Sequence, residues 1–89
     1  MMYFKIWNPI TTDENGAEFI GRCGERFSMQ HAAFEYAKDC YDEEPFDAVD
    51  YLVRANEPSS PTYRVHVHVS LNPSFEVGEP QLVASITPP

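Results

Sequence analysis

The sequence predicts an α+β fold, a two-layer sandwich in which one main helix packs on an antiparallel sheet of four to five strands, in the order β-β-α-β-β-β. Two patterns support this prediction. Residues 28–44 carry apolar residues at helical spacing, and several shorter segments alternate apolar and polar residues. The chain has 89 residues, of which 43% are hydrophobic. That length and composition predict a single domain, residues 1–89, with a modest core.

The N-terminal part predicts an antiparallel hairpin with a long loop. "MYFKIWN" at 2–8 is aromatic and alternating, and "AEFIGRC" at 17–23 reads as a second strand. Between them, Asn15 and Gly16 form a strong turn signal because both residues tolerate a positive φ.

The helix is the clearest predicted element. Ser28 can cap its first turn, and Pro45 ends it because proline disfavours helical backbone in the preceding residue. Its apolar face is expected to comprise Met29, Ala33, Tyr36, Ala37 and Cys40. Glu35, Asp39 and Asp42 recur at i, i+4 and i+7 and line the opposite face.

The C-terminal half predicts further strands. "FDAVDYLVRA" at 46–55 places Val49, Tyr51 and Val53 on one face, and "YRVHVHVSL" at 63–71 alternates most strictly. We expect the helix to cover the valine face of this second segment. The last segment, 73–89, offers one or two short strands broken by Gly78 and Pro80.

The charge excludes several classes of function. The net charge is −8 and the isoelectric point is about 4.6, which disfavours direct binding to nucleic acid or to an anionic membrane. The N-terminus lacks the features of a signal peptide, and no apolar run is long enough to span a membrane. We therefore expect a cytoplasmic protein in which Cys23 and Cys40 are reduced thiols.

Metal binding and catalysis find little support. His66 and His68 share one side of a strand, so both could reach one ion, with His31, Cys23 or Cys40 as a third ligand. Strand alternation already explains these two histidines as solvated side chains. No metalloprotease signature or phosphate loop is present. Cys23 with a histidine partner could act as a nucleophile, but no local pattern supports it. The sequence predicts no metal, no cofactor and no enzymatic activity.

The acidic segment 35–50 is the candidate functional feature. It holds seven of the 14 acids and one lysine. Carboxylates along a helix and the turn after it can imitate the charge spacing of a nucleic-acid backbone and bind a basic groove. The candidate partner-binding residues are Glu35, Asp39, Asp42, Glu43, Glu44, Asp47 and Asp50, with Tyr41 and Phe46 as aromatic anchors. The alternative is a solvated helix face above core aromatics, and Tyr36 and Tyr51 are expected in the core.

A resemblance adds to this interpretation. "YFKIWNP", "DENGAEFIGR", "SMQHAAFEYAKDC" and "VDYLVRA…YRVHVHVSLNPSFEV" together resemble small acidic proteins of bacteriophages and other mobile elements, among them the anti-CRISPR proteins. The resemblance implies a stoichiometric inhibitor in the host cytoplasm that binds a basic surface of a CRISPR effector subunit, by nucleic-acid mimicry. The alternative is a non-inhibitory accessory protein of phage or host origin, a monomer or a homodimer formed through a sheet edge.

Overall fold

The computed structural model describes residues 2–22, 28–57, 59–71 and 74–83. Strands β1 (Met2–Trp7) and β2 (Glu18–Arg22) are joined by a loop that holds the short 3₁₀ helix η1 (Glu14–Gly16). Helix α1 (Met29–Glu43) follows. The other strands are β3 (Ala48–Ala55), β4 (Thr62–Val69), β5 (Phe75–Val77) and β6 (Gln81–Leu82).

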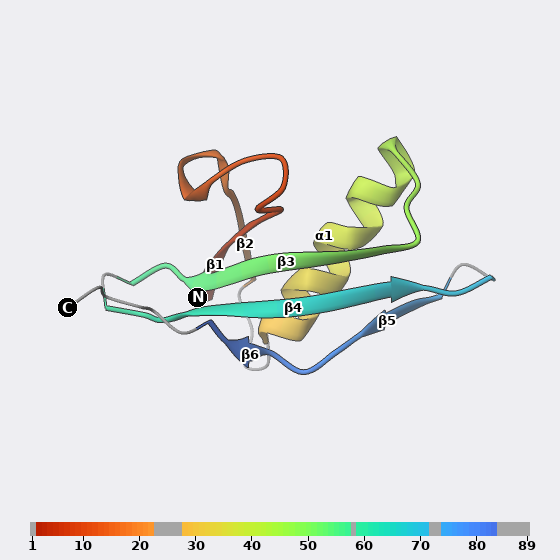
Figure 1. The fold of residues 1–89 in the computed structure, drawn as a ribbon. Coiled ribbons are helices and arrows are strands. Elements are labelled where there is room, and N and C mark those ends of the chain that lie inside the picture. Colours follow the sequence, from red (N-terminus) through yellow and green to blue (C-terminus); the bar gives the residue numbers. More distant parts are fainter. Residues whose placement is uncertain (1, 23–27, 58, 72–73, 84–89) are drawn as a thin grey trace.

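One antiparallel sheet contains all six strands, in the order β2-β1-β3-β4-β5, and β6 pairs with β4 as well. The helix connects β2 at one edge of the sheet to β3 on the other side of β1, so β1 lies between them (Figure 1). The predicted α+β class, the single packed helix and the N-terminal hairpin are confirmed. The prediction of four to five strands falls short, because Gly78 and Pro80 divide the last segment into β5 and β6.

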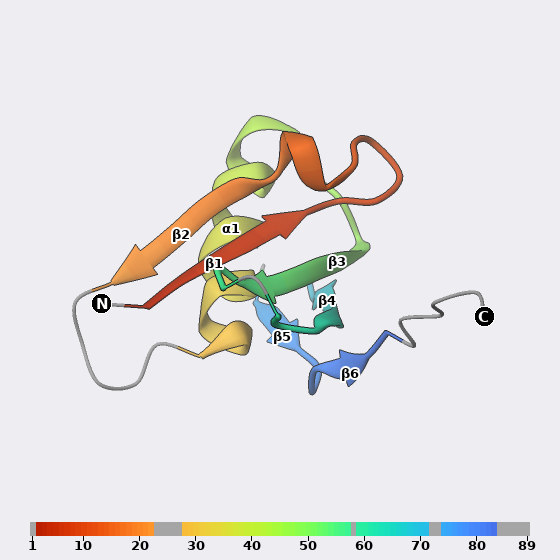
Figure 2. The ribbon, with the colours of Figure 1, turned by 90° about the vertical axis from the view of Figure 1, so that its left-hand side faces the viewer.

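Helix α1 packs across one face of the sheet, as Figure 2 shows, and contacts strands β1 to β5. The helix contributes three fully buried alanines, Ala32, Ala33 and Ala37, whose small side chains let it approach the strands closely. The strands contribute Phe4, Ile6, Tyr51, Val53, Val65 and Val67 to the same cluster. The helix therefore covers the valine face of β4, as the sequence predicts.

The helix begins and ends as the sequence predicts. The Ser28 hydroxyl accepts a hydrogen bond from the His31 amide at 3.1 Å, and Glu44, before Pro45, has extended backbone. The turn at Asn15 and Gly16 forms without a positive φ, which no described residue has. Asp13 stabilises the turn instead, since its carboxylate accepts a hydrogen bond from the Asn15 amide at 3.0 Å.

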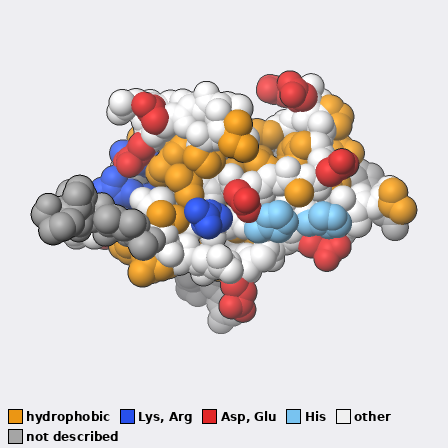
Figure 3. Space-filling view, in the orientation of Figure 1, with side chains coloured by type: hydrophobic (Ala, Val, Ile, Leu, Met, Phe, Trp, Pro, Cys, Tyr) orange, Lys and Arg blue, Asp and Glu red, His pale blue; other side chains and the backbone are white. Residues whose placement is uncertain are grey.

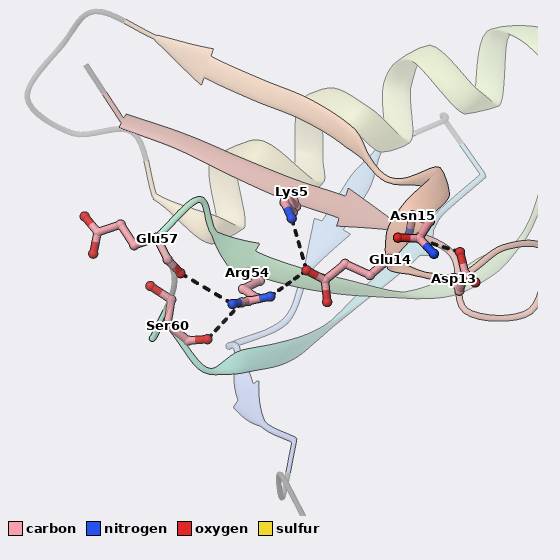
Figure 4. A network of polar contacts seen from close by, with 7 residues as sticks. All are labelled: Lys5, Asp13, Glu14, Asn15, Arg54, Glu57 and Ser60. Atoms are coloured by element: carbon pink, nitrogen blue, oxygen red, sulfur yellow. Dashed lines mark hydrogen bonds and ion pairs between the residues drawn. The ribbon is translucent and has the colours of Figure 1, made fainter.

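A polar network fixes the β1–β2 loop against the sheet face opposite the helix, which we call the distal face (Figure 4). The Glu14 carboxylate binds Lys5 of β1 at 3.2 Å and also the Arg54 guanidinium of β3. Arg54 in turn donates to the Ser60 carbonyl at 3.0 Å, in the β3–β4 connection. The network thus joins two strands and two loops. None of the described helices is long and apolar enough to cross a membrane.

Candidate partner-binding surface

Five of the seven candidate carboxylates gather at one end of the molecule. Asp39, Asp42 and Glu43 lie on the last turns of α1, Glu44 caps the helix, and Asp47 precedes β3. All five residues are exposed. We call this group the acidic end. Acidic side chains are visible in Figure 3 where α1 ends.

Among the described residues, no base forms an ion pair with the acidic end. Within the described part of the chain, none of its five side chains makes a hydrogen bond or an ion pair. Its nearest base in sequence, Lys38, lies over the Phe34 ring at 5.4 Å from the centroid. The last turn of the helix contains no base, although the helix macrodipole favours cations there. These carboxylates therefore repel one another and the helix C-terminus, a cost that a cation from outside would offset.

Glu35 and Asp50 do not belong to this group. Glu35 is half-buried, and its carboxylate lies 3.3 Å from Nε2 of His31, one helical turn earlier. Asp50 lies on the distal face, where its carboxylate contacts Nδ1 of His66 at 2.7 Å. Glu35 therefore lies earlier on the helix and Asp50 on the opposite sheet face, so neither belongs to the acidic end, and a role of either in binding a partner stays a prediction.

The two predicted aromatic anchors lie in a ring cluster. The Tyr41 ring packs edge-to-face on Phe46, with centroids 5.6 Å apart, and on Phe75 of β5 at 5.4 Å. Both Tyr41 and Phe46 are half-buried. Their rings join the end of the helix to the sheet beneath it, so packing explains them. A role in binding a partner remains a prediction.

Two hollows flank the acidic end and share Tyr36, Cys40 and Glu43 in their walls. One, of about 350 Å³, lies between α1 and β2, where Glu18 and Asp39 also line it. The other, of about 360 Å³, lies between the helix end, the start of the β1–β2 loop and β3. The acidic end is therefore bordered by recesses with partly apolar walls rather than by a flat surface.

Two tyrosines meet beneath these hollows. The Tyr36 and Tyr51 rings are 5.0 Å apart in an edge-to-face contact, and Tyr51 is only 2% exposed. Burial raises the pKa of Tyr36 to about 12, and the nearby Cys40 thiol adds to the effect. Burial and Cys40 also raise the pKa of Tyr51. Both hydroxyls thus stay protonated at neutral pH. Tyr51 is in the core, as the sequence predicts, and Tyr36 packs at its margin.

His66 and His68 lie side by side on the distal face (Figure 3). Both are exposed; their strand neighbours are Asp50 for His66, and Ala48 and Glu76 for His68. No group of three His, Cys, Asp or Glu side chains in the described segments is placed to hold a metal ion. Cys23, one of the possible third ligands, lies outside the described residues.

Two features of the structure could not be predicted from the sequence. Glu18 lines the hollow beside the helix because β2 is the edge strand nearest Asp39 and Glu43, which depends on strand order. The contacts of Glu14 with Lys5 and Arg54 join residues up to 40 positions apart, and no local pattern indicates them.

Comparisons with protein-family models, with curated protein sequences and with solved structures find no match to this chain.

Proposed function

We propose that the protein binds a basic, nucleic-acid-binding surface of another protein and blocks it stoichiometrically. The observation that supports this proposal is the acidic end: five exposed carboxylates with no ion-pair partner in the described part of the chain. Surface carboxylates of ordinary proteins are interspersed with bases, which lowers their mutual repulsion. A group without such bases favours a cationic partner.

These charges lie close enough together for several of them to face one such partner. Carboxylates one helical turn apart are roughly 5–6 Å from each other. A single nucleic-acid strand carries one charge for about each 3.4 Å of helix axis. An arginine- or lysine-lined groove shaped for phosphates can therefore pair with several of these carboxylates at once. Such a complex would compete directly with the nucleic acid.

The target that the sequence resemblance indicates is a subunit of a CRISPR effector complex. The protein would then act as an anti-CRISPR inhibitor in the cytoplasm of the bacterial host. The alternative, an accessory protein without inhibitory activity, would bind its partner without competing with nucleic acid.

A charge-reversal variant tests the proposal. Exchanging Asp42, Glu43 and Glu44 for Lys should abolish capture of a nucleic-acid-binding protein from bacterial lysate and should relieve any inhibition of a CRISPR effector. The matched control exchanges Glu57, Glu76 and Glu79, which are also exposed, for Lys. This control changes the net charge equally, but away from the acidic end, and should keep most of the binding.

Circular dichroism and thermal unfolding should show that both variants keep the fold, since none of the six side chains is buried. If the variant at the acidic end retains full binding, the proposal is wrong. If both variants lose binding equally, the net charge acts as a whole and the acidic end has no special role. A partner that binds this protein and nucleic acid simultaneously would favour the accessory role.

A further inference from the structure

Strand β2 is an open edge of the sheet. It pairs with β1 alone, and the only described elements that it contacts are β1 and α1 (Figure 2). An edge strand leaves every second pair of backbone N–H and C=O groups pointing outward, available to another strand. β2 thus presents hydrogen-bonding groups along a side of the molecule that no described segment covers.

Two of the usual protections of an edge strand, proline and a β-bulge, are missing in β2. Its sequence, EFIGR, contains no proline. Its register with β1 runs without interruption from Met2↔Arg22 to Ile6↔Glu18, so there is no bulge to twist the edge away. The strand is short, at five residues, but its pairing with β1 is regular along its whole length.

The two faces beside this edge differ in chemistry. On the helix side lies the hollow of about 350 Å³, with Ile20 and Tyr36 in its wall and the carboxylates of Glu18, Asp39 and Glu43 around it. On the distal side lie two exposed aromatic rings. Phe19 is 59% exposed and Tyr3 is 43% exposed, and the Tyr3 ring lies over Gly21, where a larger side chain would displace the ring.

Side chains of a strand added to β2 would alternate between these two faces. Those on the helix side would enter the acidic hollow, where lysine or arginine fits. Those on the distal side would lie against Phe19 and Tyr3, where apolar side chains fit. The surface therefore selects an extended segment in which basic and apolar residues alternate.

We propose that the β2 edge is the docking site for such a segment of the partner, which adds to the sheet as a further strand. This inference rests on the proposed function, because it takes the partner to be basic. A second copy of this chain is the alternative occupant of the same edge, and self-association in the absence of a basic peptide distinguishes it from the partner.

A synthetic peptide that alternates lysine and valine is the probe. Titrated into the labelled full-length protein, it should shift the backbone amide resonances of β2 and slow their hydrogen exchange. Two further peptides carry N-methyl groups on alternate residues, in the two possible registers. The peptide whose N-methyl groups replace the amide hydrogens that face β2 should bind about tenfold more weakly or worse, because it has lost those hydrogen-bond donors. The other peptide should keep its affinity.

Protein variants test the charge contribution. Glu18→Gln and Asp39→Asn should each weaken the peptide several-fold, and more at low salt than at high salt. Glu79→Gln, an exposed acid in the β5–β6 connection, is the control and should change the affinity little.

Three results would overturn the inference. In the first, both N-methylated peptides bind as well as the unmodified one, and the amide resonance shifts are confined to the acidic end. Strand addition would then be wrong, while recognition of a basic partner, judged by the lysate experiment, would stand. The peptide could fail to bind at all. Concentration-dependent shifts of β2 without peptide would identify a second copy as the occupant.

Discussion

At the scale of single residues, Glu14 connects the β1–β2 loop to two strands of the sheet. Its carboxylate contacts Lys5 and Arg54, and so holds the β1–β2 loop on the distal face (Figure 4). Burial alone would raise the pKa of Glu14, but the hydrogen bonds and charges of the two bases outweigh it, and the pKa lies below its usual value. Glu14 therefore stabilises the fold in its ionised form.

We expect Glu14→Gln to lower the free energy of unfolding by about 1 kcal/mol near neutral pH, because its side chain is partly exposed and the pair is screened by water. A carboxylate with a lowered pKa stabilises the fold above its unfolded pKa, and this contribution is lost as the pH falls through its folded pKa. Urea denaturation should therefore show the two proteins converging in acid. Glu79→Gln serves as the control, and a constant difference at all pH values would contradict this account.

The buried tyrosines predict the opposite dependence at alkaline pH. Their raised pKa values mean that the folded state holds these protons more tightly than the unfolded state does. The protonated tyrosines therefore contribute their full stabilisation below about pH 10, the pKa of tyrosine in the unfolded chain. This stabilisation is lost as the pH rises toward the higher pKa of the folded state. Urea midpoints measured across this range should decrease for the wild type and decrease less steeply for Tyr51→Phe.

Tyr63→Phe is the matched control, because Tyr63 lies on β4 and is only half-buried. A Tyr51→Phe profile as steep as that of the wild type would show that another group controls the alkaline transition.

At the scale of elements, the sequence predicts most of what forms. The helix has a cap at Ser28, a stop at Pro45 and a periodic apolar face, and all three are local signals. The strand order is not local: β1 pairs with β3 across more than 40 residues, as in Phe4↔Ala55. For this reason the prediction places Asp50 with the helix acids, although the pairing with His66 puts it on the distal face.

The contact between helix and sheet is close because of alanine. Ala33 is fully buried, so Ala33→Leu should force the helix away from the strands and cost about 1–3 kcal/mol. Lys38→Leu, at an exposed position of the same helix, should cost much less. Thermal unfolding of both variants checks this. Equal stability of the two variants would mean that the core can accommodate the added volume.

At the scale of the whole molecule, charge is unevenly distributed. Of the described bases, Lys5 and Arg54 contact Glu14, Arg64 lies on the distal face, and Lys38 lies over the Phe34 ring. The acidic end has five carboxylates, and no described base forms an ion pair with them. Composition predicts the acidity, and helical spacing predicts that Asp39 and Asp42 lie together. Only the fold shows that the acidic end borders the hollow beside β2, because that depends on which strand lies at the sheet edge.

The most direct test of the central claim is the salt dependence of binding to the captured partner. We would measure the affinity of the purified partner for the wild type and for the Asp42→Asn, Glu43→Gln, Glu44→Gln variant between low and high salt. The account predicts that wild-type affinity falls steeply with salt, and that the variant binds more weakly with a shallower dependence. Equal affinities and equal salt slopes for the two proteins would contradict it, and would mean that the acidic end faces only water.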